Sequence, residues 1–455
     1  MQLEIVKADK KERKVSPIQE VKKKKLQNRF QKTTNMKSKL LCVVIAASVL
    51  LLASCKKDSS SEEPSGRQTY YVARGGSRVT NPVNSDYCKQ AQASQTLQSL
   101  RLISGLVYRM DYCAPNMMDD FVNADIRTSG RRDSLINEWY FTPEGWEGRM
   151  DFSGACSGFV CKNEKGDLLF CRNFDGSDGD CLVLFDRVNG YKKVMLTAPF
   201  YSSPLYMSDN ALSNGTSSLH RLMRQPFVAM DGMNEYGLCY GAFQLPSLAS
   251  AYPESERAGN NPDDLNQNTG KKAIHSALFH NLILSRCKTV REVEALLAQY
   301  DMVGVIPHLN VHWLIADATG DWAIFEYWKN ELHVYREEEL KKPEMLGGRE
   351  VPYEWCSIEN YYRNPELVAT YNTDNWQKEY SPKVRIEHMM KAYKPVMTLE
   401  EALACSQEGI FSLEPGYEDM LTNWSCIYNP KERTIHFYNR NDVTKLYVVD
   451  LKKDL

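Results

Sequence analysis

Between Cys156 and the C-terminus, short apolar runs follow one another at the length and spacing of β-strands, and this pattern constrains the fold most. The predicted strands are 156–161, 168–174, 181–188, 191–198, 226–231, 237–243, 312–317, 322–327, 424–429, 433–439 and 444–450. Two helices lie between groups of strands, at 272–286 and after Thr289, where Glu292 completes a capping box. Groups of strands separated by paired helices predict a layered α+β fold rather than an alternating βαβ chain.

The first 54 residues have the pattern of an export signal. An apolar run of 13 residues, Leu40–Leu52, follows Lys37 and Lys39. Because a membrane-spanning helix needs about 20 apolar residues, this run fits a secretory signal better than a transmembrane segment. A signal of ordinary length would begin at Met36, and we expect the functional start there.

A possible lipid anchor follows the apolar run. Leu52-Ala-Ser-Cys55 resembles the cleavage box of bacterial lipoproteins, in which the cysteine receives the lipid. Residues 55–69 are polar and predict a flexible tether. An ordinary signal peptide with a chance cysteine is the alternative. We therefore expect a protein of the cell envelope, lipid-anchored at Cys55 to the outer membrane, on its periplasmic face or on the cell surface.

The charge distribution argues against a nucleic-acid partner. The chain has 56 basic and 58 acidic residues, but 13 of the basic and only 4 of the acidic residues lie in residues 1–55. The rest of the chain is therefore acidic, whereas phosphate binding needs a basic surface. A hydrophobic content of 43% with 25% charged residues is globular composition.

The cysteines are odd in number after processing. Of 13 cysteines, Cys42 leaves with the signal and Cys55 takes lipid, so at least one of the remaining 11 is unpaired. Cys88 and Cys113 flank a predicted helix and are candidates for a disulfide. Most of the others lie in apolar strand-like runs, where a buried free thiol is the commoner state.

Metal and nucleotide motifs are absent from the sequence. His308 and His312 lie four residues apart without a third ligand nearby, and no HExxH or Cys-x-x-Cys occurs. Asp175, Asp178 and Asp180 match a calcium loop only loosely and fit a polar turn better. We expect no metal and no cofactor.

The segment from Cys156 to Asp175 carries the chemistry. Cys156 opens one strand of a predicted hairpin, and Arg172 and Asp175 end its partner strand. Because the start of one antiparallel strand meets the end of the other, a thiol, a guanidinium and a carboxylate should converge. A cation beside a thiol lowers its pKa. From these residues alone, a buried cysteine near a structural Arg–Asp pair is the alternative.

Five segments in order resemble the choloylglycine hydrolase or linear amide C–N hydrolase family. These are N-terminal-nucleophile (Ntn) cysteine hydrolases, which include bile salt hydrolases, penicillin V acylases and acid-ceramidase-like amidases. The matching segments are Cys156-Ser-Gly with Arg172-Asn-Phe-Asp175, Asp231–Leu238, His312–Gly320, Ser381–Arg385 and Thr422–Ile427. The resemblance covers residues 156–450. It implies a four-layer αββα sandwich of antiparallel sheets and a hydrolase acting on linear amides.

The resemblance also implies a mechanism. In Ntn hydrolases the nucleophile is the first residue of the mature catalytic chain, and its own α-amino group serves as its base. The Cys156 sulfur would attack an amide carbonyl and form a thioester, which water then hydrolyses. The Ala155–Cys156 bond must first be cut, and precursors of this kind commonly cut it themselves.

The same resemblance assigns the other site residues. Arg172 and Asp175 would hold the thiolate and the α-amine, and Arg385 would be a second active-site arginine. Asn372 is the best candidate for the oxyanion donor. Gln244 occupies a donor position at which bile salt hydrolases have Asn and penicillin acylases often have Tyr, and this departure leaves the substrate open.

The chain before Cys156 predicts a second component. Residues 70–155 would be a small helical pro-segment or α-chain, with a helix over the 90–112 region, and residues 156–455 the catalytic β-chain. Bile salt hydrolases expose their cysteine after losing little more than Met, so this long segment is more like the acid-ceramidase group. A homo-oligomer is left open.

The expected substrate is a small-molecule amide between a hydrophobic acyl group and a small amine. Conjugated bile acids and N-acyl amines are the leading substrates, and the choice among a bile salt, an N-acyl amine and a penicillin stays open. One alternative is an unrelated Cys–His hydrolase that uses His220 or His312. The other is a non-catalytic binding lipoprotein on the same scaffold.

Overall fold

A computed structural model describes the chain in segments. They are residues 66–79, 89–140, 155–176, 179–199, 219–245, 265–304, 311–337, 344–346, 349–351, 356–360, 362–364, 385, 388–389, 391–410 and 421–455. The chain divides into two compact units, Met1–Ser65 and Gly66–Leu455, and all described residues belong to the second. The signal region, Cys55 and Asn372 therefore lie outside the described residues. Within these residues, no helix is both long enough and apolar enough to cross a membrane.

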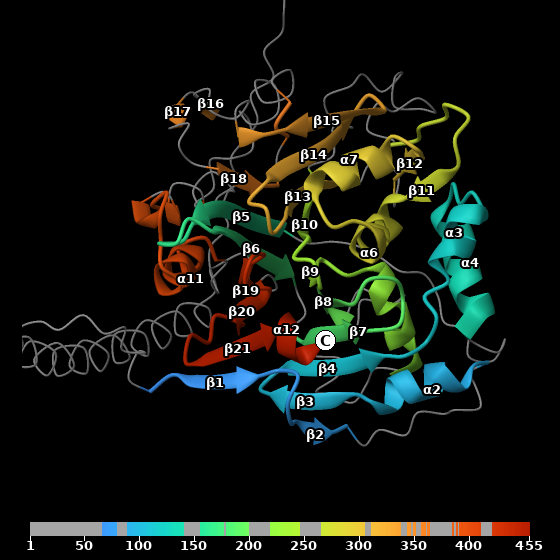
Figure 1. Cartoon of the computed structure of the whole chain (residues 1–455), viewed down its shortest axis with the longest axis horizontal. Coiled ribbons are helices and arrows are strands. Elements are labelled where there is room, and N and C mark those ends of the chain that lie inside the picture. The colour runs from blue at the N-terminus through green and yellow to red at the C-terminus, as the bar shows by residue number, and fades with distance from the viewer. Residues whose placement is uncertain are drawn as a thin grey trace, which may run out of the picture. The chain divides into compact units, whose positions relative to one another are not determined.

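Two large sheets form the second unit (Figure 1). The seven-stranded sheet has the order β1 (Gln68–Tyr71), β21 (Lys445–Asp450), β20 (Thr434–Asn439), β19 (Leu421–Asn429), β6 (Leu168–Gly176), β5 (Ala155–Lys162) and β18 (Cys356–Glu359). The ten-stranded sheet has the order β15 (Glu331–Tyr335), β14 (Trp322–Trp328), β13 (Val311–Ala316), β10 (Cys239–Gln244), β9 (Asp231–Asn234), β8 (Lys193–Thr197), β7 (Cys181–Asp186), β4 (Val107–Tyr112), β3 (Arg101–Ser104) and β2 (Ser77–Arg78). Two small sheets pair β11 (Ala273–His275) with β12 (Asp301–Val303) and β16 (Glu344–Leu346) with β17 (Arg349–Val351).

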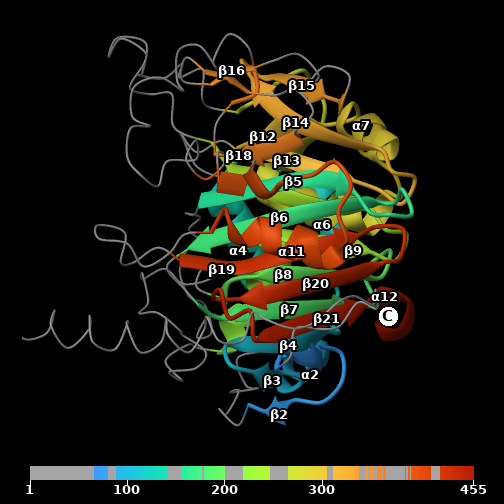
Figure 2. The ribbon, with the colours of Figure 1, turned by 90° about the vertical axis from the view of Figure 1, so that its left-hand side faces the viewer.

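Helices cover the outer faces of the two large sheets. The helices are α2 (Ala91–Gln98), α3 (Met118–Asn123), α4 (Ser129–Tyr140), the 3-10 helix η4 (Leu219–Phe227), α6 (Ser276–Arg286), α7 (Val290–Leu297), α11 (Leu399–Gln407) and α12 (Leu451–Asp454). Helix α11 crosses the face of the seven-stranded sheet (Figure 2), where Leu403 packs in one cluster with Phe159 of β5. On the ten-stranded sheet, Phe279 of α6 contacts Trp313 of β13 with ring centroids 4.7 Å apart.

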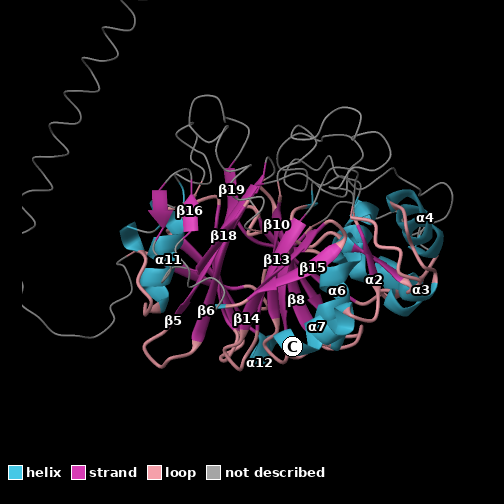
Figure 3. Ribbon diagram, turned by 90° about the horizontal axis from the view of Figure 1, so that it is seen from above, coloured by secondary structure: helices cyan, strands magenta, loops and turns pink. Residues whose placement is uncertain are grey.

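The two sheets face each other across the middle of the unit. The Arg172 guanidinium on β6 lies 4.8 Å from the ring centroid of Phe243 on β10. Viewed from above, the order is α11, sheet, sheet, and then α6 and α7 (Figure 3). The predicted α+β class with αββα layers is confirmed.

Most strand predictions after Cys156 are confirmed, including the first hairpin, where Gly166 has φ +81° in the turn. The helix predicted over 90–112 is wrong after Gln98, because β3 and β4 follow and Gly105, at φ +56°, turns the chain between them. The apolar residues in the second half of this predicted helix also alternate with polar ones, and this alternation gives β4 one buried face. The strand predicted at 226–231 begins only at Asp231, since η4 precedes it, and the helix predicted from 272 begins at Ser276 after β11.

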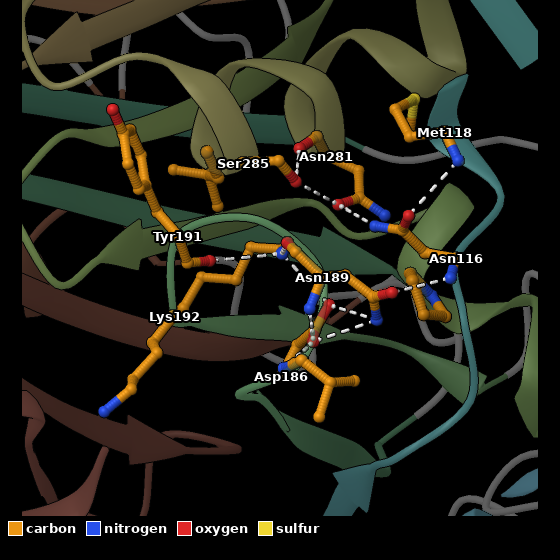
Figure 4. Close-up of polar contacts among 12 residues, drawn as sticks. Asn116, Met118, Asp186, Asn189, Tyr191, Lys192, Asn281 and Ser285 are labelled. Carbon is orange, nitrogen blue, oxygen red and sulfur yellow. Dashed lines mark hydrogen bonds and ion pairs between the residues drawn. The ribbon is translucent and has the colours of Figure 1, made fainter.

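The chain before Cys156 is part of both large sheets. Strand β4 pairs in parallel with β7, and β1 pairs in parallel with β21, so this segment supplies one edge of each sheet. A polar network continues the contact (Figure 4): the Asn116 amide N–H donates to Asn189 Oδ1 at 2.8 Å, and Asn116 Nδ2 donates to Asn281 Oδ1 at 3.3 Å. Asn189 in turn donates to both carboxylate oxygens of Asp186 on β7.

Of the cysteines in the described residues, nine have described side chains; all nine are free thiols, and eight of them are buried. The prediction of buried free thiols in the strands is therefore confirmed. Cys113 is the half-buried exception and is among the free thiols, so its predicted disulfide with Cys88 is not formed.

Candidate active site

The β5–β6 hairpin brings the predicted groups together by its register. Ala155 pairs with Asp175, Cys156 with Phe174 and Gly158 with Arg172. The Cys156 side chain is buried, and its thiol donates to the Ala242 carbonyl oxygen on β10 at 3.6 Å. The Arg172 Nη2 donates to the same oxygen at 2.6 Å, so thiol and guanidinium meet at one backbone carbonyl.

Strand alternation divides the site between two faces of the hairpin. Cys156 belongs to the core cluster between the sheets, and Arg172 lies over Phe243 on the same side. Asp175 instead pairs with Arg385, with Nη2 to Oδ2 at 2.7 Å. Arg385 also donates to the Ser157 hydroxyl at 3.0 Å and to the Gly409 carbonyl at 2.7 Å, on the side of α11.

Arg172 is held by a buried carboxylate that the sequence analysis did not select. Its Nε lies 3.1 Å from Asp231 Oδ2, and both side chains are fully buried. Asp231 also accepts the indole N–H of Trp424 at 2.9 Å and the hydroxyl of Tyr428. A side chain at Gly241 would clash with this arrangement, since an added Cβ would lie 2.6 Å from Arg172 Cδ. The motif that begins at Asp231 therefore orients the guanidinium.

The backbone of Asp175 pairs with Ala155, and its carboxylate has two side-chain partners. Arg385 forms the ion pair, and Thr422 donates its hydroxyl to Asp175 Oδ1 at 2.5 Å. Burial raises the pKa of Asp175, while the neighbouring Arg385 and Thr422 oppose that rise. The segments around Arg385 and Thr422, which are weak motifs individually, thus meet at one carboxylate.

Asn360 is the functional candidate that the sequence analysis missed. It directly follows β18, the edge strand beside β5, and its Oδ1 accepts the backbone N–H of Cys156 at 2.6 Å. Its Nδ2 donates to the Gln244 carbonyl at 2.7 Å, so Gln244 contributes its main chain here. Asn372 lies outside the described residues, and Asn360 is the asparagine that the structure places at Cys156. Only the long-range pairing of β18 with β5 reveals it.

The expected low pKa of the Cys156 thiol is wrong for the intact chain. Burial is the largest influence and raises the pKa of Cys156 above its ordinary value, and Arg172 opposes this rise without overcoming it. Asp175 raises the pKa further, and Arg385 lowers it. The sequence could show the cation but not the depth at which the thiol is buried.

Alkylation should show this raised pKa directly. At neutral pH we expect iodoacetamide to label half-buried Cys113 before Cys156 in the intact chain, because Cys156 is both neutral and buried. Since the pKa is raised, labelling of Cys156 should increase only as the pH becomes alkaline. The tryptic peptide 150–162 spans the Ala155–Cys156 bond and comes only from intact chains, so mass spectrometry of this peptide gives the measurement. Fast labelling of Cys156 in this peptide at pH 7 would contradict the expectation.

Metal ligation receives no support from the described residues, in which no three His, Cys, Asp or Glu side chains cluster to hold an ion. His312, the partner considered for a Cys–His hydrolase, faces Glu326 with Nδ1 to Oε2 at 3.2 Å in the core. His220 has no described side chain.

Residues 156–342 match the family model of linear amide C–N hydrolases, choloylglycine hydrolase family. The predicted resemblance is confirmed. The match begins at Cys156 and includes the segments at Asp231 and His312, whereas the segments around Arg385 and Thr422 lie beyond it. A bile salt hydrolase/transferase of Clostridium perfringens (strain 13 / Type A) is 26% identical over 191 residues, which are 40% of this chain and 50% of that protein. The chain thus spans about half the length of the curated relative that it matches.

The following solved structures are similar to this chain at low sequence identity. A mutant conjugated bile acid hydrolase from Clostridium perfringens is 16% identical, covering 66% of this chain and 93% of that chain with a TM-score of 0.42. Penicillin V acylase from Agrobacterium tumefaciens is 16% identical, covering 66% and 87% with a TM-score of 0.37. A Caenorhabditis elegans N-acylethanolamine-hydrolyzing acid amidase ortholog is 12% identical, covering 61% and 93% with a TM-score of 0.34.

Proposed function

We propose that this chain is an exported Ntn cysteine amidase that hydrolyses a linear amide through a thioester on Cys156. The observation that carries the proposal is the surroundings of Cys156, the residue at which the family match begins. Its thiol lies beside the Arg172 guanidinium at the Ala242 carbonyl, and its nitrogen is held by Asn360. A cysteine that only fills the core would not require a cation oriented beside its sulfur or a side-chain amide oxygen that accepts its backbone N–H.

The proposed reaction starts once the Ala155–Cys156 bond is cut. The freed α-amine, with an ordinary pKa of about 7.7–8.0, takes the proton from the Cys156 thiol. The sulfur then attacks the substrate carbonyl, the α-ammonium returns a proton to the leaving amine, and a thioester remains. Water, deprotonated by the same amine, attacks the thioester and releases the acid and the thiol. In this scheme Asn360 Oδ1 orients the amine and Arg172 stabilises charge on the sulfur.

The proposed substrate joins a hydrophobic acyl group to a small amine. The Clostridium perfringens relative is named a bile salt hydrolase/transferase, and other similar proteins are a penicillin V acylase and an N-acylethanolamine amidase. Purified protein should be offered tauro- and glyco-conjugated bile acids, N-acyl amines and penicillin V, with products identified by mass spectrometry. Release of free acid and amine from one class supports the proposal, and no turnover of any class would favour a binding lipoprotein.

We also propose that the segment before Cys156 stays bound after cleavage as a second chain. Strand β4 lies inside the ten-stranded sheet, between β3 and β7, and every residue of β7 is buried. Loss of the segment would expose that apolar strand as a sheet edge, which soluble proteins avoid. The Arg187–Asp111 ion pair at 2.6 Å and the Asn116–Asn189 bond add polar contacts across the same boundary.

The proposed lipid anchor predicts a change in location without a change in chemistry. Cys55→Ala should release the protein from membranes, because lipid rather than the short apolar run would hold the mature chain. Membrane fractionation in high salt measures the release, and amidase assays of the soluble fraction should match wild type. Continued sedimentation of the variant with membranes would contradict the lipoprotein assignment.

A further inference from the structure

A buried histidine–carboxylate pair lies at one end of the β13–β14 hairpin, outside the proposed chemistry. His312 and Glu326 are neighbours across the two strands, one position beyond the Trp313–Phe325 pair. Both side chains are fully buried, and His312 Nδ1 lies 3.2 Å from Glu326 Oε2. Burying such a carboxylate is costly unless its oxygens are hydrogen-bonded, so its other partners show what it holds.

Glu326 holds a short backbone segment from another part of the chain. Its Oε2 accepts the N–H of Arg363 at 2.8 Å, and its Oε1 accepts the N–H of Asn364 at 3.0 Å. Hydrogen bonds to an ionised carboxylate are stronger than those between neutral groups. Two consecutive amides bound to the two oxygens of one carboxylate fix both the position and the direction of the backbone.

The segment fixed by Glu326 begins at the proposed active site. Asn360, three residues before Arg363, accepts the Cys156 N–H and donates to the Gln244 carbonyl. On the other side of Asn360, β18 is paired with β5 in the seven-stranded sheet. Glu326 belongs to the ten-stranded sheet. The chain is therefore bound to the seven-stranded sheet before Asn360 and to the ten-stranded sheet after it.

We propose that Glu326, supported by His312, is a positioning residue that sets the place of Asn360 against the nitrogen of Cys156. The proposal rests on the proposed function, because it assigns Asn360 its part in the reaction. Asn360 has a short side chain on a segment that bridges two sheets, so a shift of its backbone would move its Oδ1 away from the amine. A misplacement of about 1 Å near the reacting groups can cost about 10² in rate.

Glu326→Gln tests the proposal, since it keeps the side-chain size but removes the charge and replaces one of the two acceptor oxygens by an N–H₂ group, which cannot accept a hydrogen bond from a backbone N–H. We expect kcat to fall about 10- to 100-fold with KM changed less than about threefold, as for a lost transition-state contact. Asp317→Asn is the matched control. Asp317 is a buried carboxylate at the other end of β13 that accepts the Val290 and Thr319 amides at 2.8 Å. Its variant should be less stable but should keep wild-type kcat well below its melting temperature.

A double-mutant cycle then separates positioning from general loss of structure. If Glu326 acts through Asn360, Glu326→Gln combined with Asn360→Ala should be no worse than Asn360→Ala alone, within about twofold. Losses that multiply, or an equal loss of kcat in Asp317→Asn, would overturn the proposal. Should Glu326→Gln fail to fold, His312→Gln tests the same proposal, because it leaves Glu326 in place. Its kcat should fall about 3- to 10-fold, and combining it with Asn360→Ala should lower kcat no further than Asn360→Ala alone.

An activity-independent measurement distinguishes failure of this proposal from failure of the proposed function. In a Cys156→Ala background, which we expect to remain a single chain, hydrogen exchange at the backbone amide of residue 156 reports its bond to Asn360 Oδ1. Glu326→Gln should speed this exchange at least about tenfold, while Asp317→Asn should not. If wild type hydrolyses none of the amides but this difference appears, the positioning role stands and the amidase assignment fails. Unchanged exchange in Glu326→Gln would overturn the positioning role whatever the activity.

Discussion

Replacing Cys156 by serine should reduce amide hydrolysis by roughly 10³-fold or more, because loss of a catalytic nucleophile can cost up to about 10⁶ in kcat. The hydroxyl is a much weaker nucleophile than the thiol at neutral pH, and the α-amine alone would have to activate it. Arg172 would still lie at the Ala242 carbonyl, but it stabilises a thiolate far better than it can create an alkoxide. Steady-state kinetics on whichever amide wild type hydrolyses fastest give the measurement.

Cys161→Ser is the matched control for this variant. Cys161 lies on the same strand but belongs to the cluster packed against α11, on the opposite face from Cys156. Its substitution is expected to lower stability, because it places a hydroxyl in an apolar cluster, while kcat stays close to wild type. If the Cys156 variant is folded and retains wild-type turnover, the thioester mechanism is wrong.

The sequence predicted the half of the site that is local in the chain. Cys156, Arg172 and Asp175 lie on one hairpin, whose register follows from strand period and from a turn that Gly166 permits. Sequence alone could not show that alternation turns Asp175 toward Arg385 and Arg172 toward the other sheet. That division depends on what packs against each face, which is decided by segments more than 50 residues away.

The site residues that the sequence analysis missed all lie far from Cys156 in the sequence. Asp231 reaches Arg172 from the other large sheet, and Asn360 reaches Cys156 from the end of β18, far along the chain. Asp and Asn are also common in turns, so neither residue type by itself marks a site residue. The raised pKa of Cys156 has the same origin, because it follows from burial between two sheets. Likewise, the apolar spacing after Gln98 fits helix and strand alike, and pairing of β4 with β7 selects the strand.

Self-cleavage is the prediction on which the Ntn assignment depends most. The mechanism needs a free α-amine on Cys156, yet 155 residues precede it. The Cys156 sulfur would attack the Ala155 carbonyl and the peptide nitrogen would leave as the α-amine, so that the preceding segment is held as a thioester. Water would then hydrolyse this thioester, releasing the segment with an Ala155 carboxylate and restoring the Cys156 thiol. Ala155 has Asp175 as its register partner, so the Asp175–Arg385 pair lies beside the bond to be cut.

Active wild-type protein should therefore contain two chains, one of 300 residues beginning Cys-Ser-Gly-Phe-Val and one comprising most of residues 55–155. Cys156→Ala should remain a single chain, whereas Cys161→Ala should be cut like wild type, and Asp175→Asn should be cut slowly. N-terminal sequencing and denaturing mass spectrometry identify the chains, and size exclusion without denaturant should keep them together, since β4 and β1 are built into the two sheets. An intact chain with full amidase activity would require another base for Cys156 and would exclude the Ntn mechanism even on this fold. Two chains that separate without denaturant would instead leave the mechanism in place and refute the bound second chain.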